Sequence, residues 1–398
     1  MLNTYLTNSV IYWRKNRKNN VGIFAFVDRR QGGVYQYTLT SIQALSSTNK
    51  FNYTIFTYNG NNDFDNLRLK VVKIDRNKLE KVAGPSSLIL RSMNPFLMLY
   101  SNLFKEIDII LSPVLCNHLY MTNKRFILTL HDLQEKYYPG YFTFQQRVGR
   151  HIRNLSLTRK ASRILCESNY VRNDIMKYLD VNPNKITVLQ SPAAVEFSKT
   201  DYSKEELNRI RIKYKLPDSY IFYPAQFWYH KNHERLLNAF KIIINKIGGI
   251  HLVLSGAKQN NFNHVISKIK DLAIEDNVHY IGYVDAIDLA AIYKMSAMLV
   301  MPSLYESISI PIYEAFSIGT PVCASNVFAL PEQVGDAGLL FDPNDVNDIS
   351  AKIYQLLTNH KLRIDIIERA RVKMASMNIV NYGIQLESII HDEFTKAQ

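Results

Sequence analysis

Residues 298–324 read MLVMPSLYESISIPIYEAFSIGTPVCA, and this stretch is the clearest guide to the fold. Its apolar start predicts a buried strand over 298–301, a polar loop follows, and an apolar helix is expected from about Ser309. A second short strand is expected over 321–324. Short apolar strands separated by helices are typical of parallel sheets that are covered on both faces. Ligands of such sheets bind beyond the carboxyl ends of the strands, so functional residues are expected in the loops that follow strands.

The same alternation of strand and helix extends to both sides of this stretch. Further strands are expected over 21–27, 53–57, 107–111, 126–130, 163–166, 221–223, 250–254 and 278–281, and a helix over 235–247. The break at Ser191-Pro192 predicts a boundary. We therefore predict an α/β chain with two Rossmann-like, doubly wound parallel-sheet domains that face a central cleft. The first domain covers 1–195 and the second 196–376, while the helix within 377–398 can pack back on the first.

Composition leaves several classes of partner open. The chain has 398 residues, enough for two domains with a core each, and a formal net charge of +13. Nucleic acid, an anionic lipid surface or a phosphorylated substrate would each suit this charge. The cysteines Cys116, Cys166 and Cys323 lie far apart, which argues against a disulfide framework and a structural zinc site. Neither a membrane-spanning run nor a secretory signal is evident, so a cytoplasmic location is expected.

The loop after strand 298–301 holds the strongest candidate residues. Glu306 lies in this loop and Glu314 in the following helix, and carboxylates accept hydrogen bonds from paired hydroxyls. Free backbone N–H groups at the helix start favour a phosphate. For either glutamate alone, a solvated surface position is the better explanation, with Ser309 as a simple helix cap. The residues expected to bind a ligand at the helix start are Ser307, Ile308, Ser309 and Ile310.

The sequence around these glutamates resembles the E-x7-E region of family 4 retaining glycosyltransferases, which have the GT-B fold. The likeness continues through 324–326 and 330–332 to 335–343, and it covers most of residues 125–375. The resemblance implies that Glu306 contacts the sugar of a nucleotide-sugar donor and that Glu314 contacts its ribose. It also implies that the product keeps the anomeric configuration of the donor.

A second likeness to this family lies at 223–233, which read YPAQFWYHKNH. The family often holds the donor diphosphate here with an arginine and a lysine; Lys231 fits the lysine, whereas Gln226 stands at the usual arginine position. Lys231 is therefore expected to stabilise the charge that grows on the leaving diphosphate. The alternative is an ordinary surface lysine, although a helix start disfavours a cation. His230 and His233 are expected at the surface or at a helix cap, because no third metal ligand accompanies them.

Two motifs of the first domain also follow predicted strands. Gly32-Gly33 lets the backbone approach a phosphate or a sugar, and it matches the glycine loop of the family. His131-Asp132 resembles the His-Asp pair that faces the donor sugar in the family. Alone, a glycine pair is often only a turn, and a His-Asp pair is more often structural. The chain has no G-x-G-x-x-G, which disfavours a nicotinamide or flavin cofactor.

Asp63-Phe64-Asp65 formally matches the D-x-D pattern of metal-dependent, GT-A-type glycosyltransferases. Its neighbours over 59–62 are turn formers, so a surface loop is expected. We accordingly predict no metal and no other cofactor. Ser168 is expected to cap the helix that follows it.

Two basic segments suit a peripheral contact with an anionic membrane, on the inner face of the plasma membrane. A solvated helix face explains the second equally well. Nucleic acid is disfavoured, because no recognised binding module or basic–aromatic platform is present. The first segment places Leu2, Leu6, Val10 and Trp13 ahead of Arg14, Lys15, Arg17 and Lys18, and the second contains Arg147, Arg150, Arg153, Arg159, Lys160 and Arg163.

These features predict a retaining glycosyltransferase whose catalytic candidates are His131, Lys231 and Glu306. The expected donor is a GDP- or UDP-hexose such as GDP-mannose. The expected acceptor is a growing, lipid-linked cell-surface glycan such as O-antigen or capsule. One alternative is a GT-B nucleotide-sugar epimerase, which needs no acceptor. Another is a non-catalytic basic protein that binds membrane or nucleic acid on the same scaffold.

Overall fold

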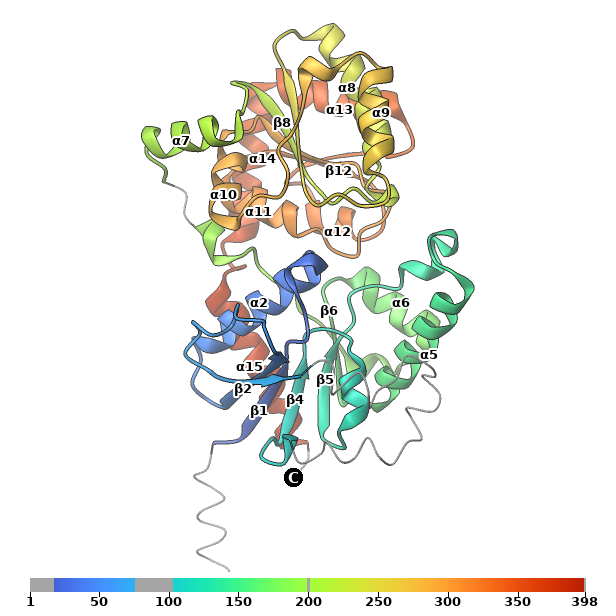
Figure 1. Ribbon diagram of the computed structural model, residues 1–398, viewed down its shortest axis with the longest axis vertical. Helices are drawn as coiled ribbons and strands as arrows, with labels where there is room; N and C mark the ends of the chain where they lie inside the picture. Colours follow the sequence, from blue (N-terminus) through green and yellow to red (C-terminus); the bar gives the residue numbers. More distant parts are fainter. Residues whose placement is uncertain (1–17, 76–102, 199–200, 397–398) are drawn as a thin grey trace, which may run out of the picture.

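The computed structural model describes residues 18–75, 103–198 and 201–396. Figure 1 shows two α/β lobes stacked along the long axis, with the lower lobe formed mainly by the first half of the chain. Each lobe has its own parallel sheet between helices. The predicted pair of Rossmann-like sheets is therefore confirmed.

The sheet of the first lobe has seven parallel strands in the order β3-β2-β1-β4-β5-β6-β7. The strand order reverses between β1 and β4, which opens a crevice at the carboxyl ends of these strands. Its helices are α2 (Gly33–Ser46), α5 (Phe144–Lys160) and α6 (Asn169–Leu179). Its strands are β1 (Asn20–Phe24), β2 (Asn52–Tyr58), β3 (Lys70–Ile74), β4 (Ile109–Ser112), β5 (Arg125–Thr129), β6 (Arg163–Cys166) and β7 (Ile186–Val188).

The sheet of the second lobe has six parallel strands in the order β10-β9-β8-β11-β12-β13. Its strands are β8 (Tyr220–Pro224), β9 (His251–Ser255), β10 (Val278–Tyr280), β11 (Met298–Met301), β12 (Val322–Ser325) and β13 (Leu339–Phe341). Its helices are α7 (Lys204–Tyr214), α8 (His233–Lys246), α9 (Phe262–Asp271), α10 (Ala286–Met295), α11 (Ile310–Ile318), α12 (Leu330–Val334), α13 (Val346–Thr358) and α14 (His360–Met374).

The stretch 298–324 forms the strand–loop–helix–strand unit that its sequence predicts. All of β11 is buried, as expected for a strand covered on both faces. Gly319 ends α11 in the left-handed conformation with φ 78°, which glycine adopts without the steric cost of a β carbon. The loop between β11 and α11 is thus held between two buried elements.

Three strands, β3, β7 and β13, were not predicted from the sequence. Each lies at an edge of its sheet, and β7 and β13 have three residues each. β3 reads KVVKI and is only partly buried. Edge strands bury less surface, so their apolar pattern is too short or too mixed to stand out.

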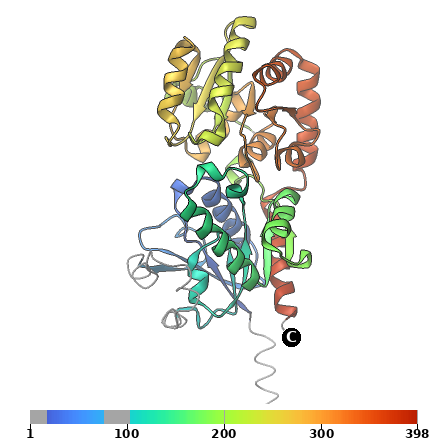
Figure 2. The ribbon, with the colours of Figure 1, turned by 90° about the vertical axis from the view of Figure 1, so that its right-hand side faces the viewer.

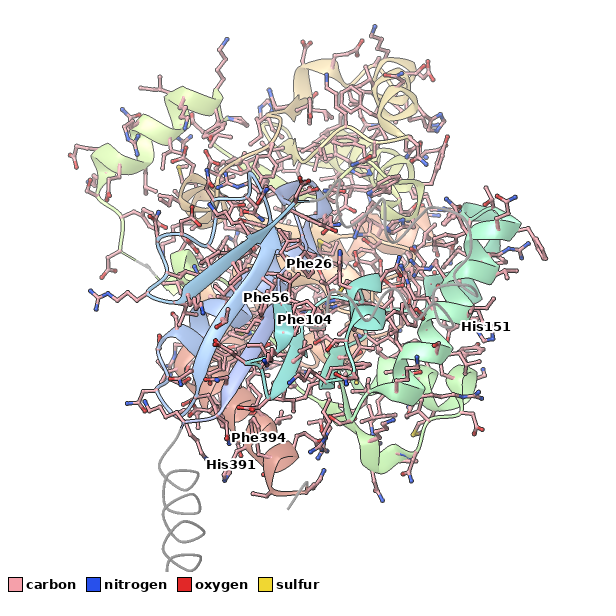
Figure 3. All side chains as sticks on the ribbon, turned by 60° about the horizontal axis from the view of Figure 1, so that its bottom comes forward. Phe26, Phe56, Phe104, His151, His391 and Phe394 are labelled. Carbon is pink, nitrogen blue, oxygen red and sulfur yellow. The ribbon has the colours of Figure 1, made fainter. Side chains whose placement is uncertain are left out.

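Phenylalanines fill the core on one face of the first sheet. The ring centroid of Phe24 lies 5.4 Å from that of Phe26 and 5.8 Å from that of Phe56, both edge-on. Phe56 also meets Phe104 at 5.0 Å, and Figure 3 shows Phe26, Phe56 and Phe104 grouped beside the strands. Aromatic packing of this kind stabilises β1 and β2, so the loop after β1 begins from a rigid element.

The C-terminal helix α15 (Ile379–Thr395) leaves the second lobe and packs on α2 of the first, as the red segment in Figure 2 shows. A β carbon at Gly383 would lie 2.7 Å from the carbonyl oxygen of Ala44, so only glycine permits this approach. Glu393 forms ion pairs with Arg125 and Arg163, each at 3.1 Å. Farther along the helix, Phe394 lies beside the first lobe (Figure 3).

The other crossing between the lobes follows β7, which ends at Val188. Ala193, Ala194 and Phe197 already belong to the hydrophobic core of the second lobe. The second core therefore begins slightly before residue 196. Within the described ranges, none of the helices combines the length and the apolar composition that crossing a bilayer requires.

Candidate active site

A cavity of about 510 Å³ lies between the lobes, at the carboxyl ends of strands from both sheets. These strands include β1, β5, β8 and β11, which are far apart in the chain. Parallel sheets bring such strand ends to one edge, which is why one cavity collects them. The roles of the candidates stay predictions. All of them line this cavity: Gly32, Gly33, His131, Gln226, Lys231, Glu306, Ser307, Ile308, Ser309, Ile310 and Glu314.

Lys231 and Glu306 form an ion pair in this cavity. Lys231 Nζ lies 2.6 Å from Glu306 Oε1, and the two side chains are only 19% and 10% exposed. The Tyr223 hydroxyl donates to the carbonyl of Lys231 at 2.7 Å, and the N–H of Leu304 donates to the carbonyl of His230 at 2.7 Å. The loops after β8 and β11 are thereby tied together. A cation for phosphate and an acceptor for hydroxyls consequently meet at one point.

The start of α11 offers fewer phosphate donors than expected. The Ser309 N–H donates to Gln333 Oε1 at 2.9 Å, and Gln333 Nε2 donates to the Ser309 carbonyl at 2.6 Å. Pro311 in the first turn has no N–H. Contrary to the expectation, the Ser309 N–H is therefore not free for a phosphate. Within residues 307–310, the N–H groups of Ser307, Ile308 and Ile310 have no hydrogen-bond partner among the described residues and remain available as donors.

The Ser309 hydroxyl, unlike its N–H, lacks a hydrogen-bond partner in the described part of the chain. Its Oγ is buried and finds no partner within the described residues, and it does not cap α11. A buried hydroxyl without a hydrogen bond is costly. Because Ser309 lines the cavity, a ligand can supply the missing hydrogen bond.

Glu314 projects from α11 and is 7% exposed. Burial raises the pKa of Glu314 to about 7, and a nearby carboxylate, Glu196, also raises it. The Tyr293 hydroxyl donates to Glu314 Oε2 at 2.8 Å, which offsets only part of this shift. A pair of ligand hydroxyls would favour the ionised form further. Binding of a diol at Glu314 would thus be coupled to loss of a proton.

Both ring nitrogens of His131 face acceptors. Nδ1 lies 3.0 Å from Glu167 Oε2, and Nε2 lies 2.9 Å from the carbonyl oxygen of Pro113. Burial lowers the pKa of His131, but the hydrogen bond and charge of Glu167, with Pro113 and Asp132, raise it overall. The imidazolium form satisfies both acceptors. His131 is therefore held by both of its ring nitrogens, and the Glu167 carboxylate beside it balances any positive charge on the ring.

The glycine loop brings the first lobe against the second. Gly32 has φ 59° and ψ −119°, a conformation that a side chain makes costly. A β carbon on Gly32 would lie 3.1 Å from Gln226 Nε2, and one on Gly33 would lie 3.7 Å from Ile310 Cδ1. Gln226 Oε1 accepts from Trp228 Nε1 at 2.9 Å. The position usually held by an arginine in the family thus carries a neutral amide against the glycine loop.

Gly32→Ala is expected to lower thermal stability and to weaken nucleotide-sugar binding about tenfold. Backbone strain of about 1–3 kcal/mol would shift the loop, and a loss of 1.4 kcal/mol is about tenfold in affinity. Gly60→Ala is the matched control, because Gly60 has φ +86° and a β carbon there meets nothing within 4 Å. Melting curves and donor titrations check both variants. Equal donor affinity in the two variants would contradict the role of Gly32.

Some cavity residues were not singled out from the sequence. Gly256 directly follows β9, where the rule on strand ends applies as well. A β carbon at Gly256 would lie 2.4 Å from the carbonyl oxygen of Ala225, so the close approach of the two loops requires glycine. The position after a strand was therefore the available signal. The main additions to the cavity wall are Glu167, Trp228, Gly256 and Tyr283.

The two histidines expected at the surface or at a cap lie elsewhere. His230 lines the cavity, and burial, together with the charge of Lys231, lowers its pKa to about 3. His233 is 1% exposed and stacks on Phe227 with ring centroids 4.5 Å apart. Burial lowers the pKa of His233 to about 3 as well. His233 therefore packs against an aromatic ring in the interior, although its place in the chain suggests a helix cap.

The lobes touch beside the cavity. Ser168 caps α6, as predicted, by accepting from the N–H of Val171 at 3.2 Å, and its hydroxyl donates to the Ser307 carbonyl at 3.0 Å. Glu332 of the second lobe accepts from the N–H of Asn169 at 3.0 Å. A carboxylate is favoured at a helix start. These contacts hold the loop of residues 302–309 against the first lobe.

The aspartates of the D-x-D pattern form ion pairs within the first lobe. Asp63 pairs with Arg29 and Asp65 with Lys73, each at 2.6 Å, and Phe64 between them is buried. In the part of the chain that the structure describes, no three His, Cys, Asp or Glu side chains group to hold a metal ion.

The two basic segments give different results. Residues 1–17, which include most of the first segment, lie outside the described residues. In the second segment, Arg150 and Arg163 form ion pairs with carboxylates of the fold. Part of its positive charge is therefore neutralised internally.

Known proteins resemble this chain in both halves. Residues 205–373 match the model for glycosyl transferases group 1, and residues 31–196 match that for glycosyltransferase family 4. The chain is 31% identical to the O-antigen chain mannosyltransferase B of Escherichia coli, over 60% of this chain and 63% of that protein. It is 26% identical to the serotype-specific mannosyltransferase WbdA of Escherichia coli, over 56% of this chain and 28% of that protein. The chain thus spans less than two thirds of either relative.

A solved structure shows the same fold. The Anabaena protein Alr3699/HepE, in complex with UDP and glucose, superposes with a TM-score of 0.76. The match covers 94% of this chain and 100% of that one at 13% identity. At this level of identity, the likeness concerns the arrangement of the two lobes.

Proposed function

Since this chain belongs to family 4 of the glycosyltransferases, we propose that its cleft binds a nucleotide-diphosphate sugar and transfers the sugar to an acceptor hydroxyl. The observation that carries the proposal is the Lys231–Glu306 pair, 2.6 Å apart, in one cavity with Glu314 and His131. A lysine suits a diphosphate, and carboxylates suit the hydroxyls of a sugar and a ribose. The relatives named as O-antigen mannosyltransferases support sugar transfer.

In the proposed complex, each group of the donor meets a matching side chain. Lys231 donates to the diphosphate, helped by the N–H groups of Ile308 and Ile310. Glu314 accepts hydrogen bonds from the ribose diol. Glu306, beside Lys231, accepts a hydrogen bond from a hydroxyl of the sugar. The bond between the sugar and the diphosphate therefore lies next to the ion pair.

The proposed chemistry keeps the anomeric configuration. The acceptor hydroxyl attacks the anomeric carbon from the face that the diphosphate leaves. The new carbon–oxygen bond forms as the bond to the diphosphate breaks, and an oxygen of the leaving phosphate takes the proton. Negative charge grows on that phosphate, and the positive charge of Lys231, together with the N–H groups of Ile308 and Ile310, lowers the barrier. These groups supply the positive charge, so we propose a reaction without a metal or other cofactor.

The proposed substrates follow from the relatives and from the surface of the first lobe. We propose a GDP- or UDP-hexose donor, with GDP-mannose first, and a growing lipid-linked glycan such as O-antigen or capsule as acceptor. α5 exposes Phe144 and Val148, at 72% and 40%, beside basic side chains. An apolar and basic surface of this kind suits peripheral contact with an anionic membrane, at the cytoplasmic face.

Two measurements test this proposal. Nucleotide sugars should raise the melting temperature, because they bind the folded protein. The best donor and a lipid-linked glycan should then yield nucleoside diphosphate and a glycoside of retained configuration by NMR, at equal rates with and without EDTA. A new nucleotide sugar formed from donor alone would identify an epimerase instead. No shift with any nucleotide sugar would contradict the proposal.

A further inference from the structure

The first lobe carries a second cavity, of about 470 Å³, away from the donor residues. It lies along the first half of α5, which flanks the first lobe in Figure 1. Gln146, Arg150 and Arg153 of α5 line it, with Asn117 and Phe142 from the preceding segments. None of these residues has a part in the proposed donor complex.

The two arginines of this cavity differ in how their charges are compensated. Arg150 donates to Asp132 at 2.8 Å and to Glu135 at 2.9 Å. Within the described residues, Arg153 forms neither a hydrogen bond nor an ion pair, and its Nε is buried without a partner. A buried donor without a partner is costly, and a cation more so. The Arg153 side chain is half-buried, and no anion among the described residues balances its charge.

The electrostatics of Arg153 agree with this geometry. Burial lowers the pKa of Arg153, the charge of Arg150 lowers it further, and the charge of Glu135 does not compensate. Asn117 Oδ1, also buried without a partner, adds a polar atom that can accept a hydrogen bond from a hydroxyl. The cavity thus offers a cation and a hydroxyl acceptor together.

The second cavity is connected to the donor cavity through Asp132. Asp132 lines the donor cavity, and its Oδ1 accepts the hydrogen bond from Arg150. An anion at Arg153 would thus lie close to the donor cavity, separated from it by the ion pair of Arg150 with Asp132.

From this arrangement we infer that Arg153 binds the phosphate or diphosphate of the acceptor, together with the side-chain amide N–H of Gln146, whose Oε1 already accepts from the N–H of Thr143. The inference rests on the proposed function, because it assigns the acceptor of that reaction. Arginine suits phosphate oxygens, since its planar fork donates two hydrogen bonds at once. The acceptor glycan would then extend past Asp132 toward the donor sugar.

Binding of geranyl diphosphate tests the site without knowledge of the natural acceptor. The donor cavity is first saturated with GDP or UDP, and binding is measured by calorimetry. We expect Arg153→Gln to weaken binding by on the order of tenfold or more, because a charge-assisted hydrogen bond is lost. Arg159→Gln, at an exposed arginine of the same helix, is the matched control and should change it less than about twofold.

Further variants separate the parts of the site. Arg153→Lys should retain part of the affinity for geranyl diphosphate, and inorganic pyrophosphate should compete with geranyl diphosphate for the site. Lys231→Ala should leave the affinity for geranyl diphosphate and for inorganic pyrophosphate unchanged. This result would distinguish the site from the donor cavity even if the proposed function fails. Melting curves and nucleotide titrations of Arg153→Gln show whether it folds. Equal binding by Arg153→Gln and Arg159→Gln, or no saturable binding to the folded wild type, would overturn the inference.

Discussion

Lys231→Ala is expected to lower the turnover of sugar transfer by roughly a hundredfold to a thousandfold, the usual effect of removing one group that stabilises developing charge. Lys231 Nζ lies 2.6 Å from Glu306, so its removal also leaves a carboxylate beside the diphosphate without its counter-charge. The repulsion should weaken binding of a nucleoside diphosphate more than that of the nucleoside. Steady-state kinetics and titrations with both ligands measure these effects.

A control and a double variant sharpen this test. Lys294→Ala removes an exposed lysine from α10 and should leave binding and turnover unchanged. If Glu306 opposes the diphosphate once Lys231 is gone, adding Glu306→Ala to Lys231→Ala should restore part of the diphosphate affinity. Equal losses for nucleoside and nucleoside diphosphate in Lys231→Ala would refute the assigned role.

Glu314→Gln is expected to weaken nucleotide binding by on the order of tenfold to a hundredfold at pH 8, because hydrogen bonds to a charged acceptor are lost. The difference should shrink as the pH falls. Since the pKa of Glu314 in the free protein is about 7, wild type must release a proton to bind a diol at lower pH. Calorimetry from pH 5.5 to 8.5 measures the nucleotide affinity of both proteins. The nucleotide itself also titrates, and the pH dependence of Glu314→Gln shows how much of the change comes from that titration.

The same carboxyl group has an effect of opposite sign on the stability of the free protein. Its folded-state pKa of about 7 exceeds the ordinary value of 4.5, so the folded protein holds a proton that the unfolded chain releases. The free energy of unfolding therefore falls as the pH rises through this window. Glu314→Gln should melt higher than wild type at pH 8 and nearly equally at pH 4, whereas Glu275→Gln, at an exposed position, should match wild type at both. A constant difference across this range would show that Glu314 is not the titrating group.

Much of the architecture could be predicted because buried parallel strands leave a strong pattern. β11 is apolar throughout and was expected at its observed position. β3 and β13 lie at sheet edges, where partial burial leaves a mixed or short pattern. Gly33 and His131 were found by the rule that ligands meet strand ends, and both line the cavity. Gly256 obeys the same rule and could have been found in this way.

The pairings inside the site could not be predicted in the same manner. Lys231 and Glu306 are 75 residues apart, and neither sequence motif indicates that they meet. The Ser309 N–H was expected to be free, but it donates a hydrogen bond to the side chain of Gln333, 24 residues later.

The order of residues along the chain was sufficient to specify the strands, the loops that follow them and the kinds of side chain those loops carry. It was not sufficient to specify which charges neutralise one another, which donors are already used, or whether Glu314 keeps its proton. Strands and helices arise from local periodicity and burial, which a sequence displays directly. Ionisation and hydrogen bonding depend on distances and on exclusion of water, and these exist only once the two lobes have come together.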